Sequence, residues 1–214
     1  LSKDLSAIME KMRGSFASRE DANHFKQIGI AIHNYHDANK RFPFADPANG
    51  DPFSKDLSWR VRLMPYMERH PEYERMDLSK GWQAPANQAA IKNCRDSYVI
   101  STGGLVCTIK TERDVKSFHS IADGTSNTIM LIENRKAAMS PWTQPLDLDI
   151  DDAVKLVTSL QKGDFIWVGL YDGSVRKLHS IKETDITEKE IRCLFDPRDG
   201  KSLDLDSIFD RLGS

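Results

Sequence analysis

Apolar residues recur every three or four positions along the start of the chain, a spacing typical of an amphipathic helix. Across residues 2–39, the first half carries Leu5, Ile8, Met9, Met12 and Phe16, and the second half carries Phe25, Ile28, Gly29, Ile32, Tyr35 and His36. The pattern predicts one long helix, with Gly14 as a candidate break. We expect the second half to pack on a sheet, with Gly29 allowing a close approach. The more polar segment before Phe25 is expected to project.

Shorter elements follow this helix. Ser58 is expected to cap a helix reaching about residue 69, unless Pro65 ends it earlier. Alternating and apolar runs predict strands at 98–102, 105–110, 117–121, 128–133, 165–171 and 174–178, with glycine-bearing turns between the members of each pair. Further helices are expected at 87–93, at 151–161, from Thr184 or Thr187 to about 194, and at 204–212. The sequence therefore predicts an α+β fold in which a long N-terminal helix packs on an antiparallel sheet.

Composition narrows the possible partners. The chain has 214 residues, 39% hydrophobic and 29% charged, and a net charge of −2 from 30 basic and 32 acidic residues. No basic face stands out, so a nucleic-acid partner is not expected. The apolar runs are too short for a membrane span. The chain begins at Leu1 without an initiating Met or a signal-peptide pattern, which indicates a processed or shortened product.

The three cysteines do not form a Cys-x-x-Cys pair, which argues against a zinc or thioredoxin-like site. Cys94 and Cys107 flank a predicted strand pair. They either form a disulfide in an oxidising compartment or are buried as small apolar side chains, and the sequence leaves both open. Cys193 is expected to be a core thiol.

Several motifs occur in a fixed order along the chain. Residues 23–36 read Asn-His-Phe-Lys-Gln-Ile-Gly-Ile-Ala-Ile-His-Asn-Tyr-His and are followed by Arg-Phe-Pro at 41–43. Residues 57–61 read Leu-Ser-Trp-Arg-Val, with Pro-Tyr at 65–66, and Cys94 follows. Asp-Gly-Thr-Ser-Asn-Thr occupies 123–128, with Glu133 downstream. Trp-Thr-x-Pro at 142–145 and Asp-Gly-Ser-Val at 172–175 complete the series.

From about residue 23 to 180, this series resembles a pseudopilin-like domain family of unknown function. The family is abundant in planctomycete bacteria, is of prepilin type and is sometimes labelled solute-binding-like. The resemblance implies a pilin-like fold, a cell-envelope setting that is periplasmic or extracellular, and no established catalysis. We expect one domain, 1–214, in which a helical extension (1–22) precedes the family-like core (23–180) and C-terminal helices (181–214) follow it.

Two features depart from the family pattern. The family often places a His ten residues before the late Asp-Gly, where this chain has Lys162. The hydrophobic prepilin stem is replaced by residues 1–22. Membrane insertion and filament assembly through such a stem therefore do not carry over.

His33 and His36 lie three residues apart, a spacing that places both on one face of a helix. With Asp37 they are candidates for part of a metal or binding site. Zinc needs further ligands that the sequence does not identify. The favoured interpretation is that both side chains cap the helix end and bond neighbouring loops.

Glu133 ends an apolar strand and is the best single candidate for a catalytic acid. The favoured alternative is a structural carboxylate paired with Arg135 or Lys136. Asp123, Ser126 and Asn127 are interpreted as turn formers, because no nucleophile-elbow motif accompanies the serine.

Asp147, Asp149 and Asp151, followed by Asp152, are weak calcium candidates. An EF-hand reading fails, since its Gly and Glu positions are occupied by Asp152 and Thr158. A calcium site of another type stays open beside helix capping.

Trp59 and Trp167 lie in apolar patterns and are expected in the core. Trp82 and Trp142 lie in proline-bearing loops and are candidates for a glycan- or ligand-binding surface.

Together these observations favour a non-enzymatic envelope or surface protein that acts in assembly or recognition. Its partners would be proteins, or copies of itself, bound through the N-terminal helix. A glycan or small-ligand binding module is the alternative, and a hydrolase centred on Glu133 is the third hypothesis. No cofactor is expected apart from the open calcium site.

Overall fold

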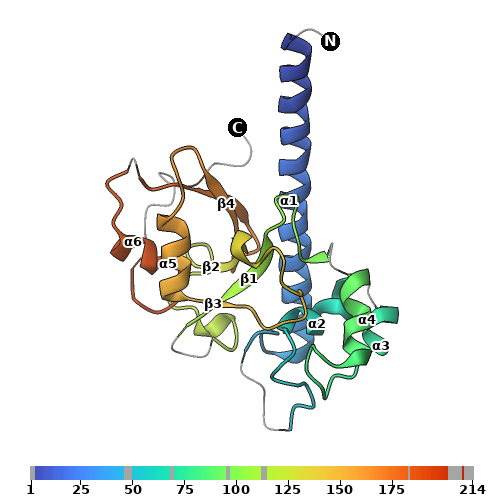
Figure 1. The fold of residues 1–214 in the computed structure, drawn as a ribbon. Coiled ribbons are helices and arrows are strands. Elements are labelled where there is room, and N and C mark those ends of the chain that lie inside the picture. The colour runs from blue at the N-terminus through green and yellow to red at the C-terminus, as the bar shows by residue number, and fades with distance from the viewer. Residues whose placement is uncertain are drawn as a thin grey trace.

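The computed structural model describes residues 3–45, 50–67, 70–94, 97–111, 115–182, 184–201 and 209. The elements in chain order are α1 (Lys3–Asn39), α2 (Trp59–Leu63), η1 (Met64–Met67), α3 (His70–Glu74), α4 (Pro85–Asn93), β1 (Leu105–Lys110), η3 (Phe118–Ser120), β2 (Ile129–Asn134), η4 (Arg135–Ala137), β3 (Leu148–Asp149), α5 (Ile150–Thr158), β4 (Phe165–Leu170), β5 (Val175–His179) and α6 (Glu188–Cys193). The expected α+β architecture, with a long N-terminal helix, a mostly antiparallel sheet and short helices, is confirmed (Figure 1).

The five strands form one sheet in the order β3-β1-β2-β4-β5. The β1–β2, β2–β4 and β4–β5 pairs are antiparallel, and the short β3 runs parallel to the end of β1. In Figure 1, α1 lies along one side of the sheet and α5 and α6 lie on the other. The N-terminal part of α1 extends beyond the body of the molecule, as the polar pattern before Phe25 predicts.

The second half of α1 supplies one wall of the core. Phe25, Ile28 and Ile32 are fully buried and Tyr35 nearly so, which confirms the predicted apolar stripe. Gly169 of β4 faces this wall: a Cβ there would lie 3.6 Å from Cδ1 of Phe25, an ordinary van der Waals distance, and 3.3 Å from Cβ of Leu131 on β2, which is the tighter contact.

The role predicted for Gly29 is wrong, since a Cβ at that position meets no described atom within 4 Å. The candidate break at Gly14 is also absent, because α1 runs through it without interruption. A single glycine costs a helix only about 1 kcal/mol relative to alanine and does not by itself end one.

Local chemistry explains the boundaries of α2, α5 and α6. Ser58 caps α2, and α2 ends at Leu63, two residues before Pro65, as expected. Asp149 caps α5, and its side chain accepts a hydrogen bond from the Asp152 N–H. Thr187 caps α6 in a capping box with Glu190, which settles the choice between Thr184 and Thr187.

Two predicted strands are wrong. Residues 98–102 contribute only an isolated bridge between Val99 and Leu105. Residues 117–121 form the short helix η3, in which the Ile121 N–H bonds the Phe118 carbonyl at 3.1 Å. At 98–102 the pairing with the start of β1 is limited to this bridge, flanked by the bonds Val106 N–H to Tyr98 carbonyl and Ile100 N–H to Gly104 carbonyl, whereas at 117–121 turn bonds replace a strand ladder. Apart from Phe209, the predicted helix 204–212 lies outside the described residues.

All three cysteines are buried free thiols. Cys107 does not bridge to Cys94. Its Sγ accepts a hydrogen bond of 3.2 Å from the Arg60 guanidinium instead. Burial raises the pKa of the Cys107 thiol to about 11, although the positive charge of Arg60 acts in the opposite direction. This thiol is therefore kept protonated and unreactive.

Candidate functional site

The C-terminal end of α1 joins a set of aromatic rings from three other segments, which we call the His36 cluster: His33, His36, Phe42, Phe118 and Tyr171. The His36 ring lies 4.6 Å from Phe118 and 5.1 Å from Phe42, measured between centroids. Phe42 also contacts Tyr171 at 5.4 Å. The cluster thus ties α1 to η3 and to the turn after β4.

The two histidines of the cluster have different environments. Nε2 of His33 lies 3.0 Å from the Tyr171 carbonyl oxygen and must carry a proton to donate to it. Both ring nitrogens of His36 are buried and have no hydrogen-bond partner among the described residues. Burial lowers the pKa of His36 below 6.5, although the Asp37 carboxylate, 3.9 Å from Nδ1, acts to raise it. The described residues contain no group of three or more potential metal ligands, so the pair acquires no third ligand there.

The Asp-Gly-Thr-Ser-Asn-Thr segment at 123–128 is a turn that docks on its neighbours. The Thr125 carbonyl accepts a hydrogen bond of 3.0 Å from the Asp172 N–H. The Asp123 carboxylate accepts the N–H groups of Asp199 and Gly200, at 2.9 and 3.0 Å. Burial raises the pKa of Asp123, and the neighbouring Asp199 carboxylate adds to that rise against the two backbone donors. The interpretation of this segment as turn formers therefore fits its contacts.

Arg60, in the Leu-Ser-Trp-Arg-Val motif, is fully buried, a feature that the sequence reasoning missed. Its guanidinium donates to the Val106 carbonyl at 2.8 Å and to the Ser58 hydroxyl at 2.7 Å, in addition to Cys107. The Tyr98 hydroxyl donates to the Arg60 carbonyl at 2.6 Å. An arginine between Trp59 and Val61 was the available signal. Its role is to join α2 to β1 inside the core.

Glu133 is a structural carboxylate by its contacts. Its side chain is completely buried and accepts hydrogen bonds from the Arg135 Nε and the Thr102 hydroxyl, both at 2.6 Å, and from the Trp167 N–H at 3.0 Å. The favoured pairing with Arg135 is therefore present. A carboxylate enclosed in this way has no open face toward a substrate.

The two loop tryptophans do not form a common cleft. Trp142 is only 1% exposed and stacks on Tyr98 with ring centroids 5.1 Å apart, so its expected exposure is wrong. Trp82 is partly buried and packs against the core edge. Trp59 and Trp167 are buried as expected. Proline-bearing loops can fold back over a core, and their composition alone does not decide exposure.

The three calcium candidates point to different partners. Asp147 accepts hydrogen bonds from the Trp59 indole and the Thr108 hydroxyl, both at 2.9 Å, while Asp149 caps α5. Asp151 forms an ion pair with Arg192 of α6. Each of the three carboxylates therefore binds different protein groups.

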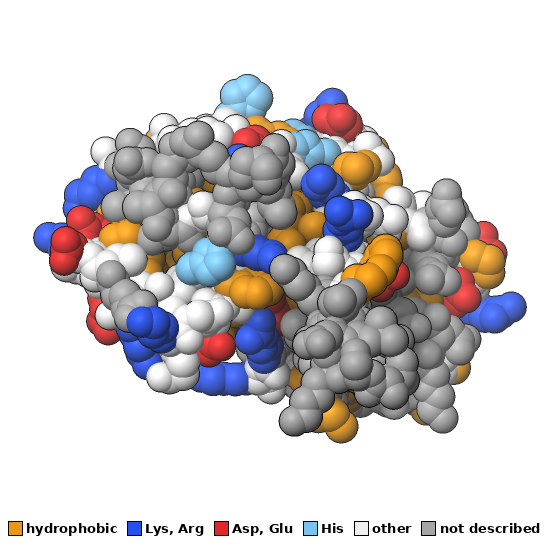
Figure 2. Space-filling model, turned by 90° about the horizontal axis from the view of Figure 1, so that it is seen from above, with side chains coloured by type: hydrophobic (Ala, Val, Ile, Leu, Met, Phe, Trp, Pro, Cys, Tyr) orange, Lys and Arg blue, Asp and Glu red, His pale blue; other side chains and the backbone are white. Residues whose placement is uncertain are grey.

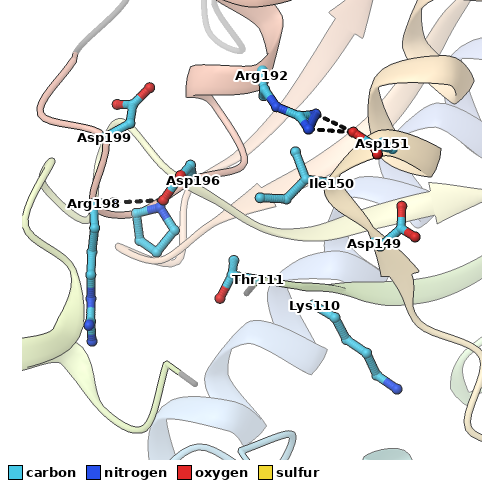
Figure 3. A pocket seen from close by; sticks show the side chains of 10 residues that line it. Lys110, Thr111, Asp149, Ile150, Asp151, Arg192, Asp196, Arg198 and Asp199 are labelled. Carbon is cyan, nitrogen blue, oxygen red and sulfur yellow. Dashed lines mark hydrogen bonds and ion pairs between the residues drawn. The ribbon is translucent and has the colours of Figure 1, made fainter. Parts of the chain in front are cut away.

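Asp149 and Asp151 lie beside a hollow of about 600 Å³ between the start of α5, the end of β1 and the segment after α6. Figure 3 shows the Asp151–Arg192 pair on one side of it and Arg198 and Asp196 on another. Its charged lining residues are Lys110, Asp149, Asp151, Arg192, Asp196, Arg198 and Asp199. The hollow thus offers both cationic and anionic groups to a polar molecule.

The side of α1 that faces away from the core carries exposed apolar side chains. Met12, Phe16 and Ile30 are 53%, 60% and 60% exposed. At about 100° per residue these three positions fall within about 40° of one another, nearly opposite Phe25, Ile28 and Ile32. We call this side the outer face of α1. The three side chains do not form one continuous patch, because the exposed polar residues Asn23 and Lys26 lie between Phe16 and Ile30 on the same side.

Charged side chains of both signs are mixed on the face of the molecule that Figure 2 shows. The view from above in Figure 2 shows basic and acidic side chains among hydrophobic and neutral ones, which fits the near-neutral net charge. Within the described part of the chain, no helix is long and apolar enough to cross a membrane.

Comparison with known proteins gives one result. Residues 21–107 match the model of a family, SBP_bac_10, described as a protein of unknown function (DUF1559). The matched stretch contains the second half of α1, the Arg60 network and the first three residues of strand β1. No curated protein and no solved structure matches the chain. The match supports a family of unknown function and attaches no activity to the chain.

Proposed function

We propose that this chain is a non-enzymatic, pseudopilin-like protein of the bacterial cell envelope, of the kind abundant in planctomycetes. In this proposal it assembles with another protein, or with copies of itself, through the outer face of α1. The observation that carries the proposal is the exposure of Met12, Phe16 and Ile30 on one side of α1, whereas the buried apolar stripe on the other side covers only the second half of the helix.

The energetics of α1 favour a partner on this face. Burying a large apolar side chain stabilises a contact by about 1.5–3 kcal/mol, so three such side chains could contribute several kcal/mol before the cost of association. None of the side chains described between residues 12 and 20 is buried. A helical segment of this length is only marginally stable alone in water, and a partner would stabilise it.

Sedimentation velocity over a wide range of protein concentration tests the proposal. Self-association is expected for the unmodified chain and is expected to weaken in Phe16→Gln and Ile30→Gln. The matched control is Met139→Gln, because Met139 is 89% exposed but lies outside α1. If the chain is a monomer at all concentrations, self-association is excluded and the partner in this proposal must be a different protein.

A cross-linking experiment separates those two cases. A photoreactive residue in place of Phe16 should couple to a second copy or to an envelope protein in cells, and the same residue at position 139 should not. Equal labelling from both positions, or none from position 16, would refute assembly through the outer face of α1.

The hollow beside α5 favours a second candidate function, the binding of a glycan or another small polar ligand. Sugar hydroxyls both donate and accept hydrogen bonds, and Lys110, Asp149 and Arg198 supply both kinds of group. Thermal-shift measurements with a panel of sugars test it. A shift that disappears in Lys110→Ala but persists in Trp82→Ala would place the ligand in the hollow rather than at the tryptophan loops.

A hydrolase centred on Glu133 is the least favoured function. Its carboxylate is enclosed by Thr102, Arg135 and the Trp167 backbone. We therefore propose a structural role for Glu133, and an esterase or glycosidase activity lost in Glu133→Gln, with unchanged folding, would contradict it.

A further inference from the structure

His36 occupies a position that suits only the neutral form of its ring. The side chain is 12% exposed, and neither ring nitrogen has a hydrogen-bond partner among the described residues. The rings of Phe42 and Phe118 lie against it. A protonated imidazole needs acceptors for two N–H groups, and a buried charge without them is strongly unfavourable.

Charged groups near His36 offer little compensation. Asp37 and His33 lie on α1 and Lys40 directly follows it; the Asp37 side chain is 82% exposed and its nearest oxygen is 3.9 Å from Nδ1 of His36. Lys40 and His33 oppose protonation. The charged or titratable side chains on the segments that pack against the ring are Arg41, Lys116, His119, Tyr171 and Asp172. Of these, Lys116, His119 and Asp172 are exposed, and Tyr171 is buried.

The contacts made by His36 hold the end of α1 to the rest of the molecule. Immediately after the helix, the Phe42 N–H donates to the Lys116 carbonyl at 2.8 Å, next to the segment that carries Phe118. Phe118 in turn touches both histidine rings, with its centroid 4.8 Å from that of His33. Removing the His36 ring from the cluster would therefore loosen both the 41–45 loop and η3 from α1.

We propose that His36 is an acid-sensitive latch: its protonation releases the 41–45 loop and η3 from the C-terminal end of α1. This goes beyond the proposed assembly function, which concerns the opposite face and the projecting half of the helix. Because the ring binds a proton less readily in the closed state than in the opened one, acidification favours opening. The latch is closed above the ordinary histidine pKa and opens as pH falls through the interval below it.

Linkage fixes the size of the effect. Between the pKa values of His36 in the opened and closed states, the opening constant rises by up to tenfold for each unit fall in pH. Above that interval, the opening constant does not depend on the protonation of His36. Only the 41–45 loop and η3 should open more readily on acidification; the sheet should remain closed.

Hydrogen exchange between pH 5 and 8, corrected for the intrinsic pH dependence of exchange, tests the proposal. The Phe42 amide is expected to lose protection on acidification, whereas the Val106 amide, bonded to the Tyr98 carbonyl at 2.9 Å, should keep it. In His36→Gln the Phe42 amide should lose this pH dependence. His119→Gln is the matched control, because His119 is exposed on η3 and its replacement should leave the pH dependence intact.

A direct titration covers the case in which His36→Gln does not fold. The NMR signal of the His36 ring in the unmodified chain should titrate below 6.5. A His36 titration at or above 6.5, or a Phe42 amide whose protection does not change with pH, would overturn the latch.

Discussion

Gly29→Ala and Gly104→Ala are expected to change the free energy of unfolding in opposite directions. The sequence alone suggests that Gly29→Ala is destabilising, whereas the structure predicts that it is stabilising. Gly29 lies in the apolar stripe of α1, and a Cβ added there meets no described atom within 4 Å. Gly104 lies beside the completely buried Glu133, and a Cβ there would fall 2.6 Å from Cγ and 2.9 Å from Oε1 of that residue. The first site has room for a methyl group and the second does not.

The magnitudes follow from these distances. Gly29→Ala replaces the flexible residue in a helix interior without a clash, so it should raise the free energy of unfolding by about 1 kcal/mol. Gly104→Ala forces Glu133 to move, but that carboxylate is held by Thr102, Arg135 and the Trp167 N–H. Overpacking of this kind costs about 1–3 kcal/mol, and a broken hydrogen bond to the carboxylate would add to it.

Urea unfolding monitored by tryptophan fluorescence measures both changes. The midpoint should rise for Gly29→Ala and fall for Gly104→Ala, with the same dependence on denaturant as the unmodified chain. In a thermal melt, 1 kcal/mol corresponds to roughly 2–4 °C for a chain of this size. Gly14→Ala is a matched control in the projecting half of α1, where a Cβ also meets nothing.

One result would refute the reasoning. If Gly29→Ala lowers stability by 1 kcal/mol or more while Gly14→Ala does not, then α1 approaches another segment closely at Gly29. The sequence-based prediction that Gly29 allows a close approach would then be correct.

Three further predictions concern the core and its charges. Arg60→Lys should lower the free energy of unfolding by about 2–4 kcal/mol, since one ammonium group cannot reach the acceptors on Ser58, Val106 and Cys107 together; urea unfolding within 0.5 kcal/mol of the unmodified chain would contradict this. Trp142→Ala should cost about 3–5 kcal/mol and Trp82→Ala only about 1 kcal/mol, so similar losses in calorimetry would disprove the difference in burial. Burial acts to raise the pKa of Asp51, but the Phe53 N–H and the Arg62 guanidinium, 2.9 Å away, outweigh it and hold that pKa below 3.8. The ionised Asp51 side chain therefore stabilises the folded chain above pH 3.8, and this stabilisation is lost as the pH falls through the lowered pKa of Asp51. Asp51→Asn should therefore flatten the acid limb of a plot of stability against pH, and an unchanged limb would show that Asp51 is not responsible.

The sequence motifs acquire a common physical meaning once their contacts are known. The His-Asn-Tyr-His end of α1, the Arg-Phe-Pro loop and the Asp-Gly turns at 123 and 172 join one another through the His36 cluster and backbone bonds. The Leu-Ser-Trp-Arg-Val motif builds the Arg60 network. These residues therefore hold segments together, and this is compatible with a family match to which no activity is attached.

The sequence by itself determined what depends on local periodicity and local hydrogen bonding. The spacing of Phe25, Ile28, Ile32 and Tyr35 specified which side of α1 is buried, because the helical repeat is the same in every protein. The cap at Ser58 was likewise readable, since a capping side chain bonds a backbone group two or three residues away, whereas the sequence left Thr184 and Thr187 as alternatives for α6.

Only the tertiary structure decided matters that depend on distant segments. Trp142 is buried with its ring stacked on Tyr98, a Cβ at Gly29 meets no described atom within 4 Å, and the Arg60 guanidinium donates to the Val106 carbonyl far along the chain. The segment 117–121 has a strand-like composition, but contacts of Phe118 with the histidines of α1 hold it as η3. Burial and close approach are properties of pairs of segments, and a pattern within one segment does not contain them.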